Sequence, residues 1–327
     1  MDDTKLNEIV EAVVRQLLAA GAVSGLQAPT PTILADQTKV EVPSVAAPSQ
    51  ASQKPLNGIL PSHVINNLTI DLSDPTIDEN RYKPRTNNPI DPAALRELIG
   101  STTARIGVGR SGPRYKTASL LLFQGDHAVT QDALYRDIYP DLLAEFGLFT
   151  VQTKITGGKE QFLLRPDLGR QLNDEAKRII SEKCVKKPNV QLVVGDGLSA
   201  AAIEANLRQI FPVLKQGVQA AGLTFGTPFH VKYCRVGVMN DIGESIQPDV
   251  VILLIGERPG LGRAESMSAY MGFKPKYGDS DADRDVVCNI FENGGTNPLE
   301  AGAFVVQIAQ KMRQHQASGV KLKLATA

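Results

Sequence analysis

The sequence predicts an α/β protein, in which a mainly helical N-terminal subdomain precedes a Rossmann-like C-terminal domain with a mostly parallel sheet. Residues 250–255 form an unbroken apolar run rich in β-branched side chains, which is typical of a strand buried on both faces of a parallel sheet. A second apolar run, residues 190–194, leads into a glycine-containing turn and then into a helical pattern. Strands that alternate with helices in this way indicate a layered, parallel α/β sheet.

The composition excludes several classes of protein. The 327 residues suit about two domains with a large core. Lys plus Arg and Asp plus Glu both total 35, so the net charge of zero predicts no broad attraction to nucleic acid or to an anionic membrane. The three cysteines form no CxxC pair, the four histidines lack metal-ligand spacing, and no apolar run could cross a bilayer. We therefore expect a cytoplasmic chain with reduced thiols, no metal site and no membrane segment.

The first 55 residues are predicted to form a helix and a linker. Residues 1–20 carry an amphipathic pattern, with apolar side chains at three- and four-residue steps from Leu6 to Leu18. Residues 21–55 are rich in Ala, Pro, Ser, Thr and Gln, which indicates a flexible linker. A short helix on such a linker is either a docking tag or an element that packs on its own domain or on a sister subunit, and the residues leave both open.

The next segments are predicted to be irregular and then helical. Residues 56–89 are interrupted by prolines and predict an extended or irregular segment. Residues 90–184 are predicted to be mainly helical, and Asp91 and Pro92 have the residue types of a helix N-cap and first turn. The expected elements are a helix from 92 to about 103, a helical stretch over 117–145 with a break near 126–127, a hairpin over 149–164 that turns at Gly157-Gly158, and a helix over 165–183.

A basic, glycine-rich stretch lies between the first two of these helices. Residues 105–116 interleave three arginines and one lysine with glycines. Guanidinium groups beside closely approachable backbone suit an anion, a phosphate or a carboxylate-bearing partner surface. A solvated basic loop accounts for the same residues.

The apolar run at 190–194 is followed by a weak dinucleotide-binding motif. Residues 195–200 match the pattern GxGxxA between a strand and a helix. The motif also requires an acidic residue about 20 positions later, and residues 205–239 contain no Asp or Glu. NAD binding is therefore disfavoured, and a tight turn whose amides face another polar ligand is the alternative. The expected elements that follow are a helix from about Ser199 that Pro212 kinks or splits, one or two strands over 226–238, a strand or short helix over 285–291, and a helix over 298–316.

The buried run at 250–255 ends in a glycine-rich loop, residues 256–262, after which a helical stretch is predicted. This loop has no Gly-Lys-Ser/Thr and is not a P-loop, and the chain contains no Gly-x-Ser-x-Gly nucleophile elbow. Ligands of open α/β sheets bind just past the carboxyl ends of such strands, and Glu257 occupies that position. Taken alone, the residues indicate a ligand-binding α/β domain without naming its reaction.

Several stretches together resemble the small (light) subunit of ethanolamine ammonia-lyase, an adenosylcobalamin enzyme. Their order and spacing cover roughly residues 92–320, which makes the resemblance more specific than any single motif. The stretches are STTARIGVGRSGPR (101–114), LLRPDLGRQL (163–172), VVGDGLSAAAI (193–203), AGLTFGTPF (221–229), YCRVGVMNDIGE (233–244), VVILLIGERPGLGRAES (250–266), ADRDVVCNI (282–290) and GGTNPLEAG (294–302).

The resemblance implies a hetero-oligomer in which the chemistry occurs on another chain. The large subunit of this family is a TIM barrel that holds ethanolamine and carries the catalytic side chains. The small subunit supplies part of the cobalamin pocket at the interface, and the adenosyl radical converts ethanolamine to acetaldehyde and ammonia. We therefore expect no catalytic residue in this chain, a helical region at 90–184 that docks on the large subunit, and a cobalamin-binding domain at 185–327.

The resemblance carries three cobalamin contacts over to this sequence. They are Val236 in YCRVG, Glu257 in GERPG and Val286 in ADRDVV. The family pattern has a cysteine at the third position, whereas here the cysteine follows two residues later, so Val286 and Cys288 both stay candidates. The valines would pack on the corrin and Glu257 would accept a hydrogen bond from it, whereas without the resemblance core packing is the preferred explanation of both valines.

The resemblance also favours one interpretation of the N-terminal helix. Enzymes of ethanolamine use are often enclosed in a bacterial microcompartment, and short amphipathic helices on linkers direct cargo into its shell. Residues 1–20 are therefore predicted to be a shell-targeting tag, which places the chain in a cytoplasmic microcompartment. The alternative functions are a non-catalytic assembly or cargo-targeting subunit that does not contact cofactor, and a self-sufficient nucleotide-dependent enzyme.

Overall fold

The computed structural model describes residues 78–102, 104–260, 263–292 and 294–326. The predictions for residues 1–20 and 21–55, and residues 56–77 of the prediction for 56–89, lie outside the described residues. The elements in chain order are α2 (Asp78–Arg81), α3 (Pro92–Gly100), β1 (Arg110–Ser111), β2 (Arg114–Tyr115), α4 (Thr117–Tyr135), α5 (Pro140–Glu145), β3 (Phe149–Gln152), α6 (Gly158–Leu164), the 3-10 turn η2 (Leu168–Arg170), α7 (Asp174–Lys183), β4 (Val190–Gly195), α8 (Ala200–Ala220), β5 (Phe229–Lys232), α9 (Val238–Ile246), β6 (Val250–Gly256), β7 (Met267–Phe273), η3 (Asp281–Asp283), β8 (Asp285–Ile290), α10 (Pro298–His315) and α11 (Val320–Thr326).

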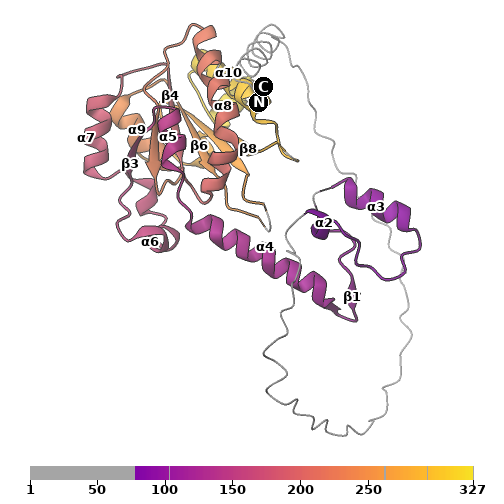
Figure 1. The fold of residues 1–327 in the computed structure, drawn as a ribbon. Coiled ribbons are helices and arrows are strands. Elements are labelled where there is room, and N and C mark those ends of the chain that lie inside the picture. Colours follow the sequence, from indigo (N-terminus) through magenta and orange to yellow (C-terminus); the bar gives the residue numbers. More distant parts are fainter. Residues whose placement is uncertain (1–77, 103, 261–262, 293, 327) are drawn as a thin grey trace. The chain divides into compact units, whose positions relative to one another are not determined.

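Within the described residues, six strands form one sheet in the order β3-β5-β4-β6-β7-β8 (Figure 1). The first four strands run parallel, whereas β7 is antiparallel to both β6 and β8. The α/β class is therefore confirmed, and the sheet is mixed. The predicted strand at 250–255 is confirmed, and every residue of β6 is buried.

The helical stretch predicted after the glycine-rich loop is wrong, because β7 follows there. The connection between β6 and β7 spans only residues 257–266. A parallel crossover needs a dozen or more residues, so this short connection returns the chain as an antiparallel neighbour. The segment 285–291, predicted as a strand or a short helix, is the strand β8, and the helix predicted at 298–316 is confirmed as α10.

The hairpin predicted over 149–164 is also wrong. Its first half is β3, which pairs in parallel with β5 through partners such as Val151 and Val231. Its second half is α6, which starts at the glycine pair where a turn was predicted. Pairing across about 80 residues leaves no local sequence signal, so the sequence pattern did not identify β5 as the partner of β3. One strand of the sheet thus comes from the region predicted to be mainly helical, and a domain boundary at 184/185 stays a prediction.

Local capping decides where the middle helices begin. The Asp91 carboxylate accepts the amides of Ala93 and Ala94 at 2.9 and 3.0 Å, which confirms the predicted start of α3. The break predicted at 126–127 lies instead at 136–139, between α4 and α5. The helix predicted over 165–183 is shortened to η2 and α7, and the Asn173 side chain caps α7 by accepting the Ala176 amide at 2.7 Å. Helix α8 continues through Pro212.

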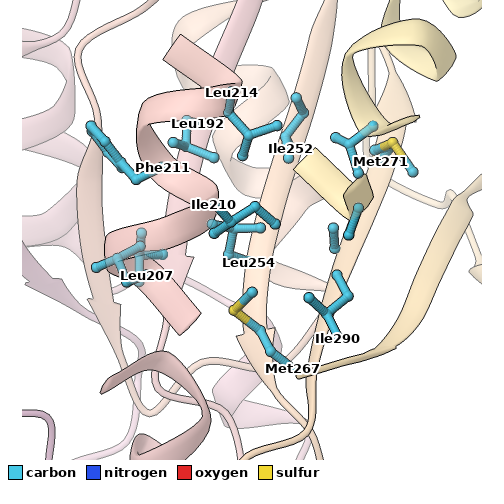
Figure 2. Packing of buried hydrophobic residues seen from close by; sticks show 14 of the residues in the cluster. Leu192, Leu207, Ile210, Phe211, Leu214, Ile252, Leu254, Met267, Met271 and Ile290 are labelled. Carbon is cyan, nitrogen blue, oxygen red and sulfur yellow. The ribbon is translucent and has the colours of Figure 1, made fainter. Parts of the chain in front are cut away.

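Two apolar clusters fill the two sides of the sheet. On one side, α8 and α10 pack on alternate residues of β4, β6, β7 and β8 (Figure 2). On the other side, α7 and α9 pack on the opposite residues of β4, β5 and β6. Burying a Leu or Ile side chain contributes about 1.5–3 kcal/mol, so this double layer holds the strands in register. Figure 2 labels Leu192, Leu207, Ile210, Phe211, Leu214, Ile252, Leu254, Met267, Met271 and Ile290.

The order of the strands creates a switch point beside β4. The chain leaves β4 through α8 to reach β5 on one side, and then crosses through α9 to reach β6 on the other. The carboxyl ends of the three strands therefore meet at one edge of the sheet. Such an edge is the usual ligand-binding position of an open α/β sheet. One strand, β5, forms in the segment 226–238, where one or two were predicted, and residues 233–237 after it form a loop at this edge.

Candidate functional site

A buried carboxylate after β4 holds the loop that follows β5. The Asp196 side chain accepts the amides of Tyr233 and Cys234 at 2.9 and 2.8 Å. Asp196 is 1% exposed, and the Lys159 ammonium lies 3.4 Å from its carboxylate. Because charge-assisted hydrogen bonds in a buried setting are strong, Asp196 fixes the conformation of residues 233–237.

The turn after β4 packs on protein atoms. Gly197 has a φ of +57°, and a Cβ at this position would lie 2.3 Å from the Gly256 carbonyl oxygen. The Leu198 amide donates to that same carbonyl at 3.1 Å. The GxGxxA turn therefore brings the ends of β4 and β6 together, and this amide is not free to bind a ligand.

The loop after β5 borders a cavity of about 570 Å³. Val236 is half-buried, packs against the apolar cluster under α9 and also lines the cavity. Arginines from three separate segments share this lining. The lining includes Arg170, Arg235, Val236, Asn240, Asp281 and Arg284.

Glu257 lies immediately past β6 with its carboxylate held by two serines. Ser266 Oγ donates to it at 2.7 Å, and Ser268 Oγ donates to its other oxygen. The backbone amide of Asn289 donates to the carboxylate at 3.3 Å. A carboxylate offers about four acceptor positions, so these three donors orient it and leave capacity for a ligand.

Val286 and Cys288 project from the edge strand β8. The register pairs Val286 with Tyr270 of β7, so the two side chains share one face of the sheet. Val286 is 46% exposed, which is a large exposure for an apolar strand residue. Cys288 is also exposed, and the period of two along a strand puts it on the same face as Val286.

The pKa of Tyr270 is affected by the charged groups around it. Burial raises the pKa of its hydroxyl, and the negative charges of Asp281 and Glu257 raise that pKa further. The phenol is therefore neutral at physiological pH and can donate a hydrogen bond. We call the surface formed by Glu257, Tyr270, Val286 and Cys288 the exposed face of β7 and β8.

Comparison with known proteins identifies the family. A family model described as ethanolamine ammonia-lyase light chain (EutC) matches residues 92–323. The ethanolamine ammonia-lyase small subunit of Clostridium perfringens is 47% identical over 237 residues, which cover 72% of this chain and 80% of that protein. The small subunit of Listeria monocytogenes is 44% identical over 262 residues, 80% of this chain and 89% of that one. The chain belongs to the ethanolamine ammonia-lyase light chain family. It is therefore a subunit of a carbon–nitrogen lyase.

Within this light chain the predicted contact residues lie on one side of the sheet. Val236 packs on the cluster under α9, and Glu257 and Val286 belong to the same side. None of the three is fully buried. Their role as cobalamin contacts stays a prediction, as does the choice between Val286 and Cys288.

Sequence reasoning missed the arginines and the serines of this light chain's site. Arg170, Arg235 and Arg284 each lie within a stretch that carries the family resemblance, namely RPDLGR, YCRVG and ADRDV. The sequence does not show that these arginines line one cavity, because those stretches are far apart in the chain. The serines that hold Glu257 are Ser266 and Ser268. They were missed because the segment after the glycine-rich loop was predicted to be helical.

The basic stretch at 105–116 is partly engaged within the light chain. Arg105 forms an ion pair with Asp126, which is fully buried in α4 and also pairs with Arg81 at 3.0 Å. The Lys116 ammonium donates to the Arg85 carbonyl at 2.7 Å. Two of the basic groups therefore tie the preceding segment to α4, whereas Arg110 and Arg114 are exposed.

The described part of the light chain offers no cluster of three or more His, Cys, Asp or Glu side chains suited to a metal ion. Among the same residues, no helix combines the length and the apolar character needed to span a membrane.

Proposed function

We propose that this chain supplies one wall of the adenosylcobalamin site of ethanolamine ammonia-lyase. The observation that carries the proposal is the position of Val236, Glu257 and Val286 on one side of the sheet, with Val236 and Glu257 at the carboxyl edge where ligands of α/β folds bind. The family membership supports it, since ethanolamine ammonia-lyases are generally adenosylcobalamin-dependent.

The side chains fit the chemistry of a corrin. Its apolar faces suit Val236 and Val286, which keep part of their surface exposed in this chain. Its rim of amides suits the remaining acceptor capacity of Glu257, which the two serines hold in place. A preoriented carboxylate loses little side-chain entropy on binding, so this contact contributes both affinity and orientation.

The bound cofactor would supply a cobalt–carbon bond whose homolysis starts the elimination of ammonia from ethanolamine. The residues of this chain would bind the corrin, orient it toward the partner subunit and exclude water from one of its sides. We assign the substrate site and the hydrogen-transfer steps to the large subunit, and no catalytic residue to this chain.

We further infer that the region over 90–184 docks on the large subunit. Helix α4 supports this inference, because Leu120 and Leu121 are 47% and 45% exposed on a helix of 19 residues. Leu98 of α3 is 54% exposed as well. Exposed apolar side chains on surface helices are typical of a protein interface.

We also propose that residues 1–20 direct the chain into a bacterial microcompartment in the cytoplasm. The support is the amphipathic pattern of this segment and the linker composition of residues 21–55. The apolar stripe would bind the shell, while the linker leaves the enzyme free to assemble.

Reconstitution tests the main proposal. The chain is co-expressed with the large subunit, and acetaldehyde formation from ethanolamine is measured with and without adenosylcobalamin. We expect turnover only when both subunits and the cofactor are present. Turnover by this chain alone, or turnover that does not need adenosylcobalamin, would contradict the proposal.

A further inference from the structure

The cavity beside Val236 contains two arginines that form no ion pair within the described residues. Arg170 is exposed at the end of η2 and has no side-chain partner among the described residues. Arg235, one residue before Val236, donates to the Phe162 carbonyl at 3.2 Å and stacks on the Phe162 ring at 4.3 Å. No carboxylate within the described residues forms an ion pair with either guanidinium.

The two guanidinium groups are close enough to repel each other. Partial burial lowers the pKa of Arg235, the positive charge of Arg170 lowers it further, and the negative charge of Asp196 opposes part of the shift. The Arg235 Nε is buried and has no hydrogen-bond partner. Two like charges that share a cavity with an unused donor favour the binding of an anion between them.

A third arginine of the cavity also has a buried donor that is not used. Arg284 is 9% exposed, and its terminal nitrogens donate to Asp281 and Asn240 at 2.7 and 2.9 Å. Its Nε is buried without a partner. The neighbouring carboxylate of Asp241 is engaged elsewhere, since it accepts the Leu172 amide at 2.8 Å. Asp241 and Asp281 of the lining therefore form no ion pair with Arg170 or Arg235, and the charge of the nearby Asp196 favours the charged form of Arg235.

The backbone adds to the positive character of this cavity. Helix α9 begins directly after Val236 and Gly237, both of which line the cavity. In the part of the chain that the structure describes, the amides of these two residues donate to no backbone carbonyl. Free amides at a helix N-terminus together with guanidinium forks form a binding site for a phosphate group.

We propose that Arg170 and Arg235 bind the phosphodiester of the cofactor's nucleotide tail in this cavity. The inference rests on the proposed function, because it takes the cofactor to be a cobalamin and adds the place of its phosphate. The position agrees with the size of the cofactor: Val236 packs on one part of it, while the arginines next to Val236 bind its anionic tail. Arg284, two residues before Val286, links the cavity to the exposed face of β7 and β8.

The test compares two corrinoids on the complex of both subunits. Cobalamin carries the phosphodiester, and cobinamide lacks the whole nucleotide tail. Dissociation constants are measured for the wild type and for Arg170→Met, Arg235→Met and Arg170→Lys, with cobinamide measured by competition. Arg178→Met is the matched control, because Arg178 is 63% exposed on α7 and pairs with Glu182 away from the cavity.

We expect Arg170→Met and Arg235→Met to weaken cobalamin binding about tenfold or more and to change cobinamide binding less than about twofold. Arg170→Lys should recover part of the affinity, and Arg178→Met should have no effect. Cobalamin affinity within twofold of the wild type in Arg170→Met would overturn the inference, and so would an equal loss for both corrinoids. Because Arg170 is exposed, its substitution tests the inference even if Arg235→Met fails to fold. A wild-type complex that binds neither corrinoid would instead refute the proposed function.

Discussion

The Glu257 carboxylate accepts a hydrogen bond from Ser266 Oγ at 2.7 Å, and this contact spans the loop between β6 and β7. It preorients the acceptor that we propose for a corrin amide. We expect Glu257→Ala to weaken cobalamin binding by the two-subunit complex about tenfold, because one hydrogen bond to a charged group is lost. Equilibrium titration of cobalamin measures this.

Glu182→Ala is the control for this variant, since Glu182 is 57% exposed on α7 and pairs only with Arg178 among the described residues. Its cobalamin affinity should equal that of the wild type. Unchanged affinity in Glu257→Ala would favour the alternative in which this chain assembles or targets the enzyme without contacting cofactor.

Thiol labelling tests whether the exposed face of β7 and β8 is covered by cofactor. Burial raises the pKa of Cys184 to about 11 and the pKa of Cys234 well above its usual range, so both thiols stay protonated. Cys288 is exposed. We expect a maleimide to modify Cys288 first, and bound cobalamin to slow that reaction several-fold. Mass spectrometry of tryptic peptides measures the rate, and an equal rate with and without cobalamin would place the cofactor elsewhere.

A pair of glycine variants tests the contact between the ends of β4 and β6. Gly197→Ala forces a methyl group to within 2.3 Å of the Gly256 oxygen, and Gly197 also has a positive φ of +57°. Gly222 has a φ of +69° with no atom within 4 Å of the added methyl group. We expect Gly222→Ala to lower the free energy of unfolding by about 1 kcal/mol and Gly197→Ala to lower it by about 3 kcal/mol or more. Urea denaturation measures both, and equal losses would contradict the close approach.

The stability of the chain should fall in mild acid because of His230. Burial lowers the pKa of this imidazole to about 4, although the Asp196 charge partly opposes the shift. The unfolded chain therefore binds a proton between pH 6.5 and about 4 that the folded chain does not bind. Above pH 6.5 the imidazole is neutral in both states and stability does not depend on it. Below pH 6.5 the free energy of unfolding decreases as the pH falls, by about 2 kcal/mol at pH 5. His230→Gln should remove that part of the pH dependence in urea titrations, and an unchanged slope would show that other groups cause it.

The tag proposal predicts a separation of activity from location. Deleting residues 1–20 should leave acetaldehyde formation by the two-subunit enzyme unchanged and abolish its co-sedimentation with microcompartment shells. Replacing Leu6, Val10 and Leu17 by Gln should have the same effect, because it removes the apolar stripe. Replacing Lys5 and Glu8 by Gln on the polar face is the control. Continued encapsulation of the deletion variant would refute the tag.

Predictions from local patterns succeeded where one segment carried the whole signal. The run at 250–255 indicated an interior strand, because it is short, rich in β-branched residues and has no polar face to present to water. Asp91 and Pro92 marked a helix start whose hydrogen bonds involve only neighbouring residues. The predictions for 149–164 and for the segment after residue 262 failed, because strand pairing there depends on partners elsewhere in the chain.

The order of residues along the chain was enough to establish the α/β class, the family and the edge of the sheet that carries Glu257, since each depends on short-range pattern or on motif spacing. The gathering of Arg170, Arg235 and Arg284 around one cavity was decided only by the folded chain. Residues that lie many positions apart in the chain approach each other only after the strands have paired and the helices have packed. The electrostatic relationship among those arginines is therefore a property of the packed sheet, which no single stretch of sequence contains.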